Sequence, residues 1–238
     1  MLELKNVSFS YNQYRQVISD MNFKIEKDEC VGIIGANGAG KSTILKLLVG
    51  LELGFSGEIF VEGIKLEKKT LNQIRQKIGY VFQDSDSQLF MPTVYDDVSF
   101  APRNYGYSKK DVEEKTLDAL RKIGIENLKD RPIYSLSGGQ KKLASIATVL
   151  SMNPNILIFD EPTIALDPKN RRRFIKILNE LNTTKIVTSH DLDLIYDTCS
   201  RTILIDDGKI ISDGDTKEIL TNKQLLEEHN LELPLSMY

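Results

Sequence analysis

The chain has 238 residues, 41% hydrophobic and 27% charged, so it is long and apolar enough to bury a substantial core, which excludes a disordered chain. Its formal net charge of -3 excludes a global positive field that would attract nucleic acid or an anionic membrane. No apolar run approaches the length that crosses a bilayer, and the N-terminus lacks the pattern of a signal peptide. Cys30 and Cys199 are too few and too isolated for a disulfide framework or a zinc site, which favours a reducing compartment such as the cytosol.

The first 84 residues or so contain two kinds of predicted structure. "MLELKNVSFS" at the start and "SGEIFVEG" at residues 56–63 have the composition of strands and predict an antiparallel β lobe. Between them, "CVGIIGA" is a β-branched run typical of a parallel strand that is covered on both faces. The segment "KSTILKLLVG" follows, with apolar residues on one broad helical face. The predicted order is therefore strand, glycine-rich loop, helix.

The glycine-rich loop matches the phosphate-loop pattern G-x-x-x-x-G-K-[ST] through Gly35, Gly40, Lys41 and Ser42. Glycines are needed because a Cβ would keep the backbone amides from closing around phosphate oxygens. We expect Lys41 to reach the β- and γ-phosphates of a nucleotide, Ser42 to face Mg²⁺, and Thr43 to reach the α-phosphate. The other residues of this expected cradle are Asn37, Gly38 and Ala39. A βα turn that binds nothing is the alternative, and it requires neither the lysine nor the hydroxyl.

A second buried strand, "NILIFDEP", ends in two adjacent carboxylates, Asp160 and Glu161. At the carboxyl end of a strand in an open α/β sheet, we expect Asp160 to hold Mg²⁺ through water and Glu161 to face the γ-phosphate. There Glu161 would act as the general base on the attacking water. Adjacent strand residues point in opposite directions, which would separate the two roles. The alternative is an acidic pair that contacts only solvent.

Between these motifs, "YSLSGGQKKLASIATVL" resembles the signature sequence of ATP-binding cassette (ABC) ATPases. Physically it predicts a second anion cradle, with Ser137 as N-cap, glycines that allow close backbone approach, and a helix that begins near Gln140. The resemblance implies that this cradle contacts the γ-phosphate bound by a partner subunit, so that two head-to-tail copies enclose two ATP molecules. The residues implied to bind are Ser137, Gly138, Gly139 and Gln140. A helix start without a ligand is the alternative.

Further residues match the family pattern in order and spacing. Tyr11 is positioned like the aromatic residue that stacks on adenine, with Val17 as a second contact, although core packing is an alternative for both. Gln83, in "IGYVFQD", corresponds to the Q-loop glutamine, and the resemblance implies that it reaches Mg²⁺ and the attacking water.

Two more residues match the family near the end of the pattern. Asp167, in "ALDP", matches the loop that communicates across the dimer, and His190, in "KIVTSHD", matches the switch histidine that contacts the γ-phosphate and positions Glu161. The sequence departs from many relatives at Ile164, where a small or polar residue is common, and at Leu143, where arginine is common. Neither position carries the expected chemistry.

The segment "DSDSQLFMPTVYDDVSFAPRNYGYS" resembles the ATPase subunits of energy-coupling factor transporters, including cobalt and nickel types. Its apolar residues either line a groove for a helix of a membrane partner or form the core of a small helical lobe. These residues are Leu89, Phe90, Val94, Val98 and Phe100. The tail "LLEEHNLELPLSMY" resembles the start of an accessory C-terminal region, most of which we expect to be absent.

The predicted fold is α/β: a phosphate-loop, RecA-like core with a mostly parallel sheet, an antiparallel β lobe and a small helical lobe. We expect one ABC ATPase domain over residues 1–238, with the core at about 1–84 and 135–238 and the helical lobe at about 85–134. "NILIFDEP", "TKIVTS" and "TILIDDGKII" provide strands for the second part of the core.

The resemblance implies an ATPase subunit that uses ATP and Mg²⁺, pairs with a second ABC ATPase subunit and powers an integral membrane transporter. It would lie on the cytoplasmic face of the cell membrane and serve an importer of cobalt, nickel or a vitamin. A soluble cassette ATPase acting on DNA or ribosomes is the alternative, but long coiled-coil insertions, a second cassette and basic surface are lacking, so we expect no nucleic-acid partner. A regulatory module without turnover is disfavoured by the presence of Glu161 and His190.

Overall fold

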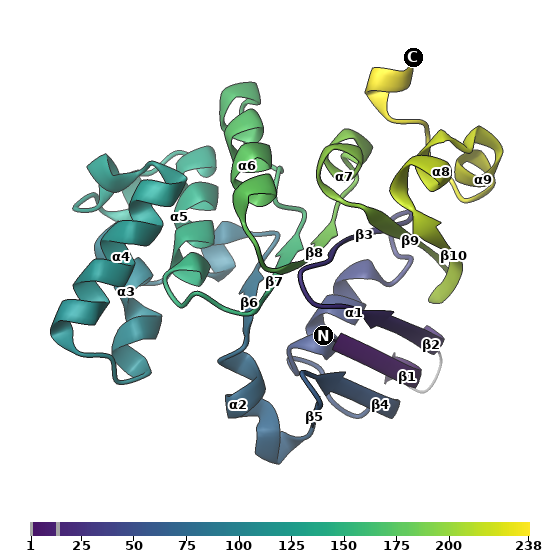
Figure 1. Ribbon diagram of the computed structural model, residues 1–238, viewed down its shortest axis with the longest axis horizontal. Helices are drawn as coiled ribbons and strands as arrows, with labels where there is room; N and C mark the ends of the chain where they lie inside the picture. The colour runs from purple at the N-terminus through teal and green to yellow at the C-terminus, as the bar shows by residue number, and fades with distance from the viewer. Residues whose placement is uncertain (1, 13–14) are drawn as a thin grey trace.

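Two β-sheets form the centre of the molecule in a computed structural model that describes residues 2–12 and 15–238 (Figure 1). The larger sheet has the strand order β10-β9-β3-β8-β7-β6. Its strands are β3 (Cys30–Ile34), β6 (Ile78–Val81), β7 (Ile156–Asp160), β8 (Thr184–Thr188), β9 (Arg201–Asp206) and β10 (Lys209–Asp215). All neighbours in this sheet are parallel except β10, which forms an antiparallel hairpin with β9. The predicted mostly parallel sheet is confirmed.

The smaller sheet is antiparallel and has the order β2-β1-β4-β5. Its strands are β1 (Leu2–Asn12), β2 (Arg15–Ile25), β4 (Ser56–Val61) and β5 (Ile64–Lys65). In β1, Leu2, Leu4, Val7 and Phe9 are buried in one hydrophobic cluster, with an irregularity in the pairing between Leu4 and Val7, so one face of the sheet carries the apolar residues. This face packs on helix α1 (Lys41–Leu48), which lies between the two sheets. The predicted antiparallel β lobe is confirmed.

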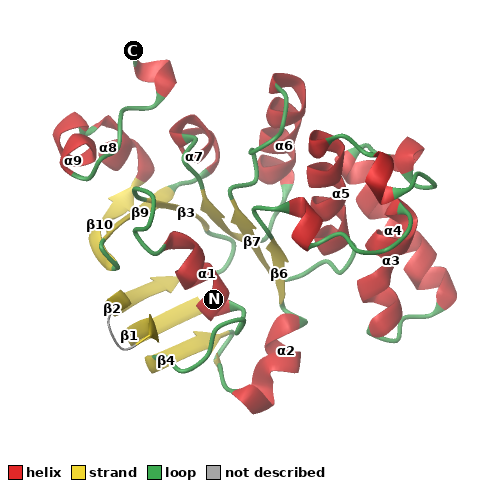
Figure 2. Ribbon diagram, turned by 180° about the vertical axis from the view of Figure 1, so that it is seen from behind, coloured by secondary structure: helices red, strands yellow, loops and turns green. Residues whose placement is uncertain are grey.

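The remaining helices are α2 (Leu71–Arg75), α3 (Val94–Asn104), α4 (Lys109–Ile123), α5 (Gly138–Leu150), α6 (Pro168–Glu180), α7 (Leu192–Thr198), α8 (Thr216–Thr221) and α9 (Lys223–Glu228). All of them except α2 cover the other side of the large sheet or one of its edges, and α2 lies on the side of the smaller sheet (Figure 2). Short 3₁₀ turns occupy Lys68–Thr70, Ser85–Ser87, Glu126–Leu128, Ile133–Ser135 and Leu235–Met237. Helices α3 and α4 lie within residues 85–134, and α5 packs against both of them and against the edge strand β6. No helix in the described ranges is both long and apolar enough to cross a bilayer.

The side chains of the parallel strands alternate between two hydrophobic clusters, one on each face of the large sheet. Leu157 and Phe159 of β7 belong to the cluster formed with α5, α6 and α7. Ile156 and Ile158 of the same strand belong to the cluster formed with α1 and the smaller sheet. Every residue of β3, β7 and β8 is buried, which explains why β3 and most of β7 are continuous apolar runs in the sequence, whereas β8 also buries Thr184, Lys185 and Thr188. The polar residues that follow them are held at one edge of a rigid sheet.

The two cysteines are neighbours in space. Cys30 begins β3 and Cys199 follows α7, and their buried Sγ atoms lie 3.6 Å apart as free thiols. The expectation that they are isolated is wrong, because the fold brings two residues that are 169 positions apart in the sequence into contact. Within the described residues, no group of three or more His, Cys, Asp or Glu side chains is arranged to hold a metal ion.

Candidate nucleotide-binding and catalytic site

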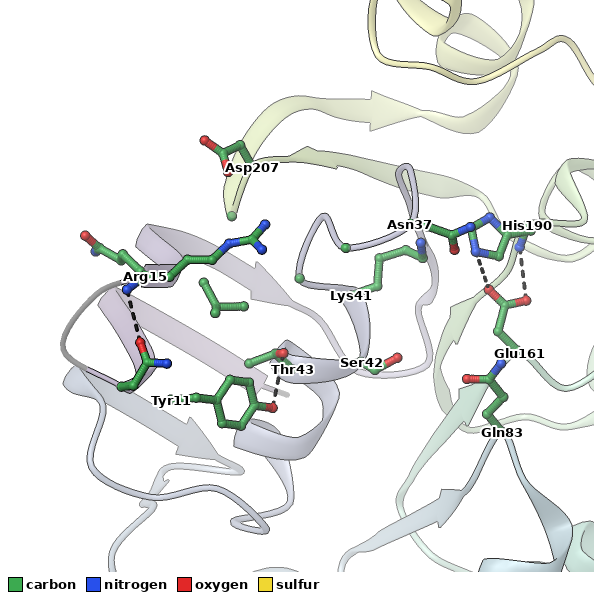
Figure 3. Close-up of a pocket in the computed structure, with 16 residues that line it drawn as sticks. Tyr11, Arg15, Asn37, Lys41, Ser42, Thr43, Gln83, Glu161, His190 and Asp207 are labelled. Carbon is green, nitrogen blue, oxygen red and sulfur yellow. Dashed lines mark hydrogen bonds and ion pairs between the residues drawn. The ribbon is translucent and has the colours of Figure 1, made fainter.

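A pocket of about 410 Å³ lies where β3, β6, β7 and β8 end at the same edge of the large sheet (Figure 3). Side chains from the smaller sheet and from the β9–β10 turn close its far side. The lining residues are Tyr11, Asn12, Arg15, Gln16, Val17, Asn37, Gly38, Gly40, Lys41, Ser42, Thr43, Gln83, Glu161, His190, Asp207 and Gly208. Segments that are far apart in the sequence therefore meet at one opening.

The phosphate loop has the backbone shape that its glycines were expected to permit. A Cβ on Gly35 would lie 2.2 Å from the carbonyl oxygen of Ile205, so no larger residue fits there. Gly38 has φ of +83°, and no atom lies within 4 Å of the place where its Cβ would project. Gly40 caps α1 without a side-chain hydrogen bond, and no acidic residue lies in the first helical turn. The loop is thus an open concavity next to an uncapped helix N-terminus, which suits an anion.

Lys41 places its ammonium group inside this loop. The side chain is buried, and Nζ donates to the carbonyl oxygens of Gly35 at 2.7 Å and Ala36 at 3.1 Å. Burial lowers the pKa of Lys41, while the carboxylates of Glu161 and Asp160 oppose this shift. The loop carbonyls hold the lysine, which leaves its positive charge available to phosphate oxygens.

Asp160 is the last residue of β7, is buried, and accepts three side-chain hydrogen bonds. The donors are Thr188 Oγ1 at 2.7 Å, Tyr80 Oη at 3.1 Å and Ser42 Oγ at 3.2 Å. Burial, followed by the charge of Asp160, raises the pKa of Tyr80, so the phenol stays a proton donor. A carboxylate next to a serine hydroxyl is the kind of hard oxygen donor set that Mg²⁺ prefers. The residues present therefore fit this metal.

Glu161 lies just beyond the strand and has φ of +47°, in the left-handed region. The backbone turn therefore separates its carboxylate from that of Asp160. The expectation that the alternation of strand residues separates them is wrong. Oε2 of Glu161 accepts from the backbone N–H of His190 at 3.1 Å and from Ser189 Oγ at 3.3 Å. Oε1 is buried without a hydrogen-bond partner among the described residues, and Nε2 of His190 lies 3.6 Å from it. An unpaired buried carboxylate oxygen at the pocket is a suitable proton acceptor.

Gln83 follows the end of β6 and points into the pocket beside Glu161 (Figure 3). The backbone carbonyl oxygen of Gln83 accepts a hydrogen bond at 2.8 Å from Nζ of Lys142, a residue that sequence reasoning missed. Burial lowers the pKa of Lys142 to about 8, against the opposing charges of Asp160, Asp84 and Glu161. The sequence gives no clear signal for Lys142, because the helix positions three and four residues away are Gly138, Gly139, Ser145 and Ile146, of which only Ile146 is a large apolar residue.

Tyr11 and Val17 both line the pocket on the side of the smaller sheet. Tyr11 is 52% exposed, and its hydroxyl lies 3.3 Å from Thr43 Oγ1, so core packing does not explain it. Arg15 and Asp207 line the same region and were missed by sequence reasoning. The sequence offered a signal for Arg15, because it lies only four residues after Tyr11. It offered none for Asp207, which reaches the pocket only because the β9–β10 hairpin folds back over it.

The signature residues lie outside this pocket within the single chain. Ser137 is confirmed as the N-cap of α5, with a reciprocal bond pair in which Gln140 N donates to Ser137 Oγ and Ser137 N donates to Gln140 Oε1. The helix begins at Gly138, slightly earlier than expected. Gly138 and Gly139 have no side chain to cover the helix N-terminus.

Two other expected binding residues also lie outside the pocket. Ala39 is buried, and its backbone bonds within the loop and to Gly208. Asp167 caps α6 by accepting from the backbone N–H groups of Lys169 and Asn170, both at 2.9 Å. These hydrogen bonds lower the pKa of Asp167. Within one chain, Asp167 therefore has a structural role.

A phosphate loop, a buried aspartate next to its serine, and a buried glutamate next to a histidine define a phosphate-loop nucleoside triphosphatase. The chain belongs to the ABC transporter family, since the family profile described as ABC transporter matches residues 18–164. The chain is thus an ATP-hydrolysing subunit of an ABC transporter, the class that its signature sequence predicted.

Three similar proteins illustrate this relationship. The chain is 41% identical to the energy-coupling factor transporter ATP-binding protein EcfA of Methanosphaera stadtmanae, over 98% of the chain and 86% of that protein. It superimposes with a TM-score of 0.84 on cbiO1 from Clostridium perfringens, described as part of the ABC transporter complex cbiONQ, with 36% identity over 98% of this chain and 95% of that one. The dimeric structure of a bacterial ABC transporter cassette gives a TM-score of 0.83 with 30% identity, over 91% of this chain and 99% of that one.

Proposed function

We propose that the chain hydrolyses MgATP in a closed dimer of ABC ATPase subunits and powers an energy-coupling factor importer of a metal ion, such as cobalt or nickel, or of a vitamin. The observation that carries the catalytic part is Oε1 of Glu161, which is buried at the pocket with no partner among the described residues except the imidazole 3.6 Å away. In this proposal residues 1–238 are one cassette, with a helical lobe at about 85–134 on a core of about 1–84 and 135–238.

The chain's own groups divide the work of hydrolysis. The backbone amides from Asn37 to Gly40 and the ammonium of Lys41 bind the β- and γ-phosphates, and Thr43 binds the α-phosphate. Mg²⁺ held by Ser42, Gln83 and Asp160 would neutralise charge on the phosphate oxygens. Glu161 takes the proton of the attacking water at Oε1, while His190 orients that carboxylate and contacts the γ-phosphate.

The signature cradle is proposed to act on the nucleotide of a second subunit. Its N-terminal amides, with Ser137, Gly138, Gly139 and Gln140, lie outside the chain's own pocket, so a partner must bring such a cradle to the γ-phosphate. The dimeric state of the similar cassette supports this arrangement. Asp167, at the start of α6, would then lie near the subunit boundary. The partner is a second copy or a related ATPase.

A groove between the helical lobe and the core is proposed to receive the membrane subunit. It has a volume of about 360 Å³ and is lined by aromatic residues from both sides. Phe90 and Phe100 are 65% and 39% exposed, and their rings meet edge to face at 4.8 Å. The other three apolar residues of the segment, Leu89, Val94 and Val98, are buried in the core of the lobe, so the sequence grouped two different environments. The relatives' names, which place them in transporter complexes, support a site on the cytoplasmic membrane face.

Replacing Glu161 with glutamine tests the catalytic part of the proposal. The variant should bind MgATP with unchanged affinity, elute as a stable dimer in its presence, and lose at least roughly 100-fold in turnover, because the amide cannot accept the proton. Glu180→Gln, on the exposed end of α6, is the matched control and should behave like the parent protein. Unchanged turnover in Glu161→Gln would remove Glu161 from the mechanism, and a monomer in MgATP would contradict the dimer.

A further inference from the structure

Two polar side chains connect the segment that carries Gln83 to the signature helix α5. The first is Lys142, which is only 1% exposed. Its Nζ donates to the carbonyl oxygen of Phe82 at 2.9 Å and to that of Gln83 at 2.8 Å. Both carbonyls lie just beyond the end of β6, where the chain has left the sheet. The ammonium group therefore binds two consecutive peptide units.

The second is Gln88, which reaches the same segment from the other direction. Its Oε1 accepts from the backbone N–H of Phe82 at 3.1 Å. Its Nε2 donates to the carbonyl oxygen of Ser145 at 2.7 Å and to Thr148 Oγ1 at 2.8 Å, both on α5. We call Lys142 and Gln88 together the clasp. It binds the N–H and the C=O of Phe82 and fixes both to one helix.

A buried charge at this position is costly, because the ammonium group loses its hydration. An apolar side chain of the same length would fill the space without this cost. The same replacement would leave the carbonyls of Phe82 and Gln83 without their donor. A lysine here is thus explained by the position of those two peptide units and not by core packing. The neighbouring Lys141 is different, since it pairs with Asp86 at the surface.

The clasp lies between three functional elements. Gln83 lines the nucleotide pocket, Phe82 lines the apolar groove, and α5 begins at the signature residue Gly138, with Ser137 as its N-cap. Several hydrogen bonds to one helix leave the segment no freedom to move separately from it, since stretching any of them leaves a buried polar group unsatisfied.

We propose that Lys142, with Gln88, is a positioning residue that fixes Gln83 to the signature helix, so that the glutamine and the signature cradle move as one body. This inference rests on the proposed role of Gln83 in hydrolysis. It assigns Lys142 no contact with nucleotide. A displacement of α5, whether from a second subunit or from a partner in the groove, changes the position of Gln83 by the same amount.

Lys142→Met tests the clasp, because it keeps the length of the side chain and removes the donors. We expect kcat for MgATP to fall about tenfold or more through misplacement of Gln83, with KM and nucleotide affinity within about twofold of the parent. Lys141→Met is the matched control on the adjacent residue and should keep the parent kcat. Gln88→Leu removes the other half of the clasp, from a residue outside the nucleotide pocket, and should give the same kinetic pattern. It remains available as the test if Lys142→Met does not fold.

A double-mutant cycle with Gln83→Ala separates positioning from general destabilisation. If Lys142 acts through Gln83, Lys142→Met lowers kcat in the parent but not in the Gln83→Ala background. An equal loss in both backgrounds, or an unchanged kcat in Lys142→Met and Gln88→Leu, overturns the clasp and leaves the proposed function intact. An unchanged kcat in Gln83→Ala would overturn the role proposed for Gln83 and the clasp with it, while the outcome for Glu161→Gln would still stand.

Discussion

The imidazole Nε2 of His190 lies 3.6 Å from Oε1 of Glu161, and the backbone N–H of the same histidine donates to Oε2 at 3.1 Å. One residue therefore contacts both oxygens of the carboxylate. The backbone bond does not depend on the side chain, so a substitution at His190 changes the environment of Oε1 alone. This makes the histidine a sensitive probe of how Glu161, the proposed general base, is oriented.

We expect His190→Ala to lower kcat roughly 100-fold, the effect of losing one preorganised polar contact at a reacting phosphate. Nucleotide affinity should stay close to that of the parent, because the phosphate loop is untouched. The measurement is steady-state ATP hydrolysis together with nucleotide titration. The chain's second histidine, His229, pairs with Asp206 at 2.8 Å and does not line the pocket, so His229→Ala is the control. Equal losses in both variants would contradict a specific role for His190.

Replacement of Tyr11 should affect affinity and not turnover. Stacking of a base on an aromatic ring contributes about 1–3 kcal/mol, so Tyr11→Ala should raise KM for ATP about tenfold with kcat nearly unchanged. Tyr11→Phe keeps the ring and loses only the contact of the hydroxyl with Thr43 Oγ1, so it should resemble the parent. If the phenylalanine variant binds as weakly as the alanine variant, the hydroxyl and not the ring face is the determinant.

A charge in the apolar groove should abolish association with the membrane subunit. Phe90→Asp places a carboxylate where burial by a partner would remove it from water, which is strongly unfavourable. Sedimentation with membranes that carry the transporter's membrane subunits should fall to background, while ATP binding by the purified variant persists.

Tyr134→Asp is the control for this experiment, since Tyr134 is 86% exposed and does not line the groove. Leu89 is unsuitable as a test position because it is buried, and a charge there would disrupt the lobe itself. Full sedimentation of Phe90→Asp would show that the groove is not the docking site.

Stability should depend on pH through Lys142. Burial lowers its pKa to about 8 in the folded chain, from an ordinary value of 10.5, so the unfolded chain binds more protons between these pH values. Relative to Lys142→Met, the free energy of unfolding of the parent should therefore be flat below about pH 7 and rise above pH 8 by up to about 1.4 kcal/mol per pH unit.

Urea denaturation at several pH values, without nucleotide or metal, measures this difference. Lys141→Met is the control, because it changes the adjacent residue and keeps Lys142, so its free energy of unfolding should rise above pH 8 as that of the parent does. A constant difference between the parent and Lys142→Met from pH 7 to about 10 would mean that folding does not lower the pKa of Lys142.

The parts of the site whose residues are neighbours in the chain could be predicted from the sequence. The phosphate loop is one continuous segment, and the acidic pair directly follows an apolar strand, so their positions at the end of a sheet could be predicted from local patterns. The mostly parallel sheet and the antiparallel lobe could be predicted for the same reason, since continuous and alternating apolar runs differ in the number of faces they bury.

The contacts between side chains that are far apart in the sequence could not be predicted and are known only from the folded structure. Thr188 and Tyr80 reach Asp160 from positions 28 and 80 residues away, and Lys142 reaches Gln83 from 59 residues away. Leu89 is buried in a hydrophobic cluster that includes residues of α3, α4 and α5, while Phe90 is exposed, although the two are adjacent in sequence. Such contacts depend on how whole helices and strands pack against each other. A local pattern of residues along the chain does not specify which distant residues will be brought together.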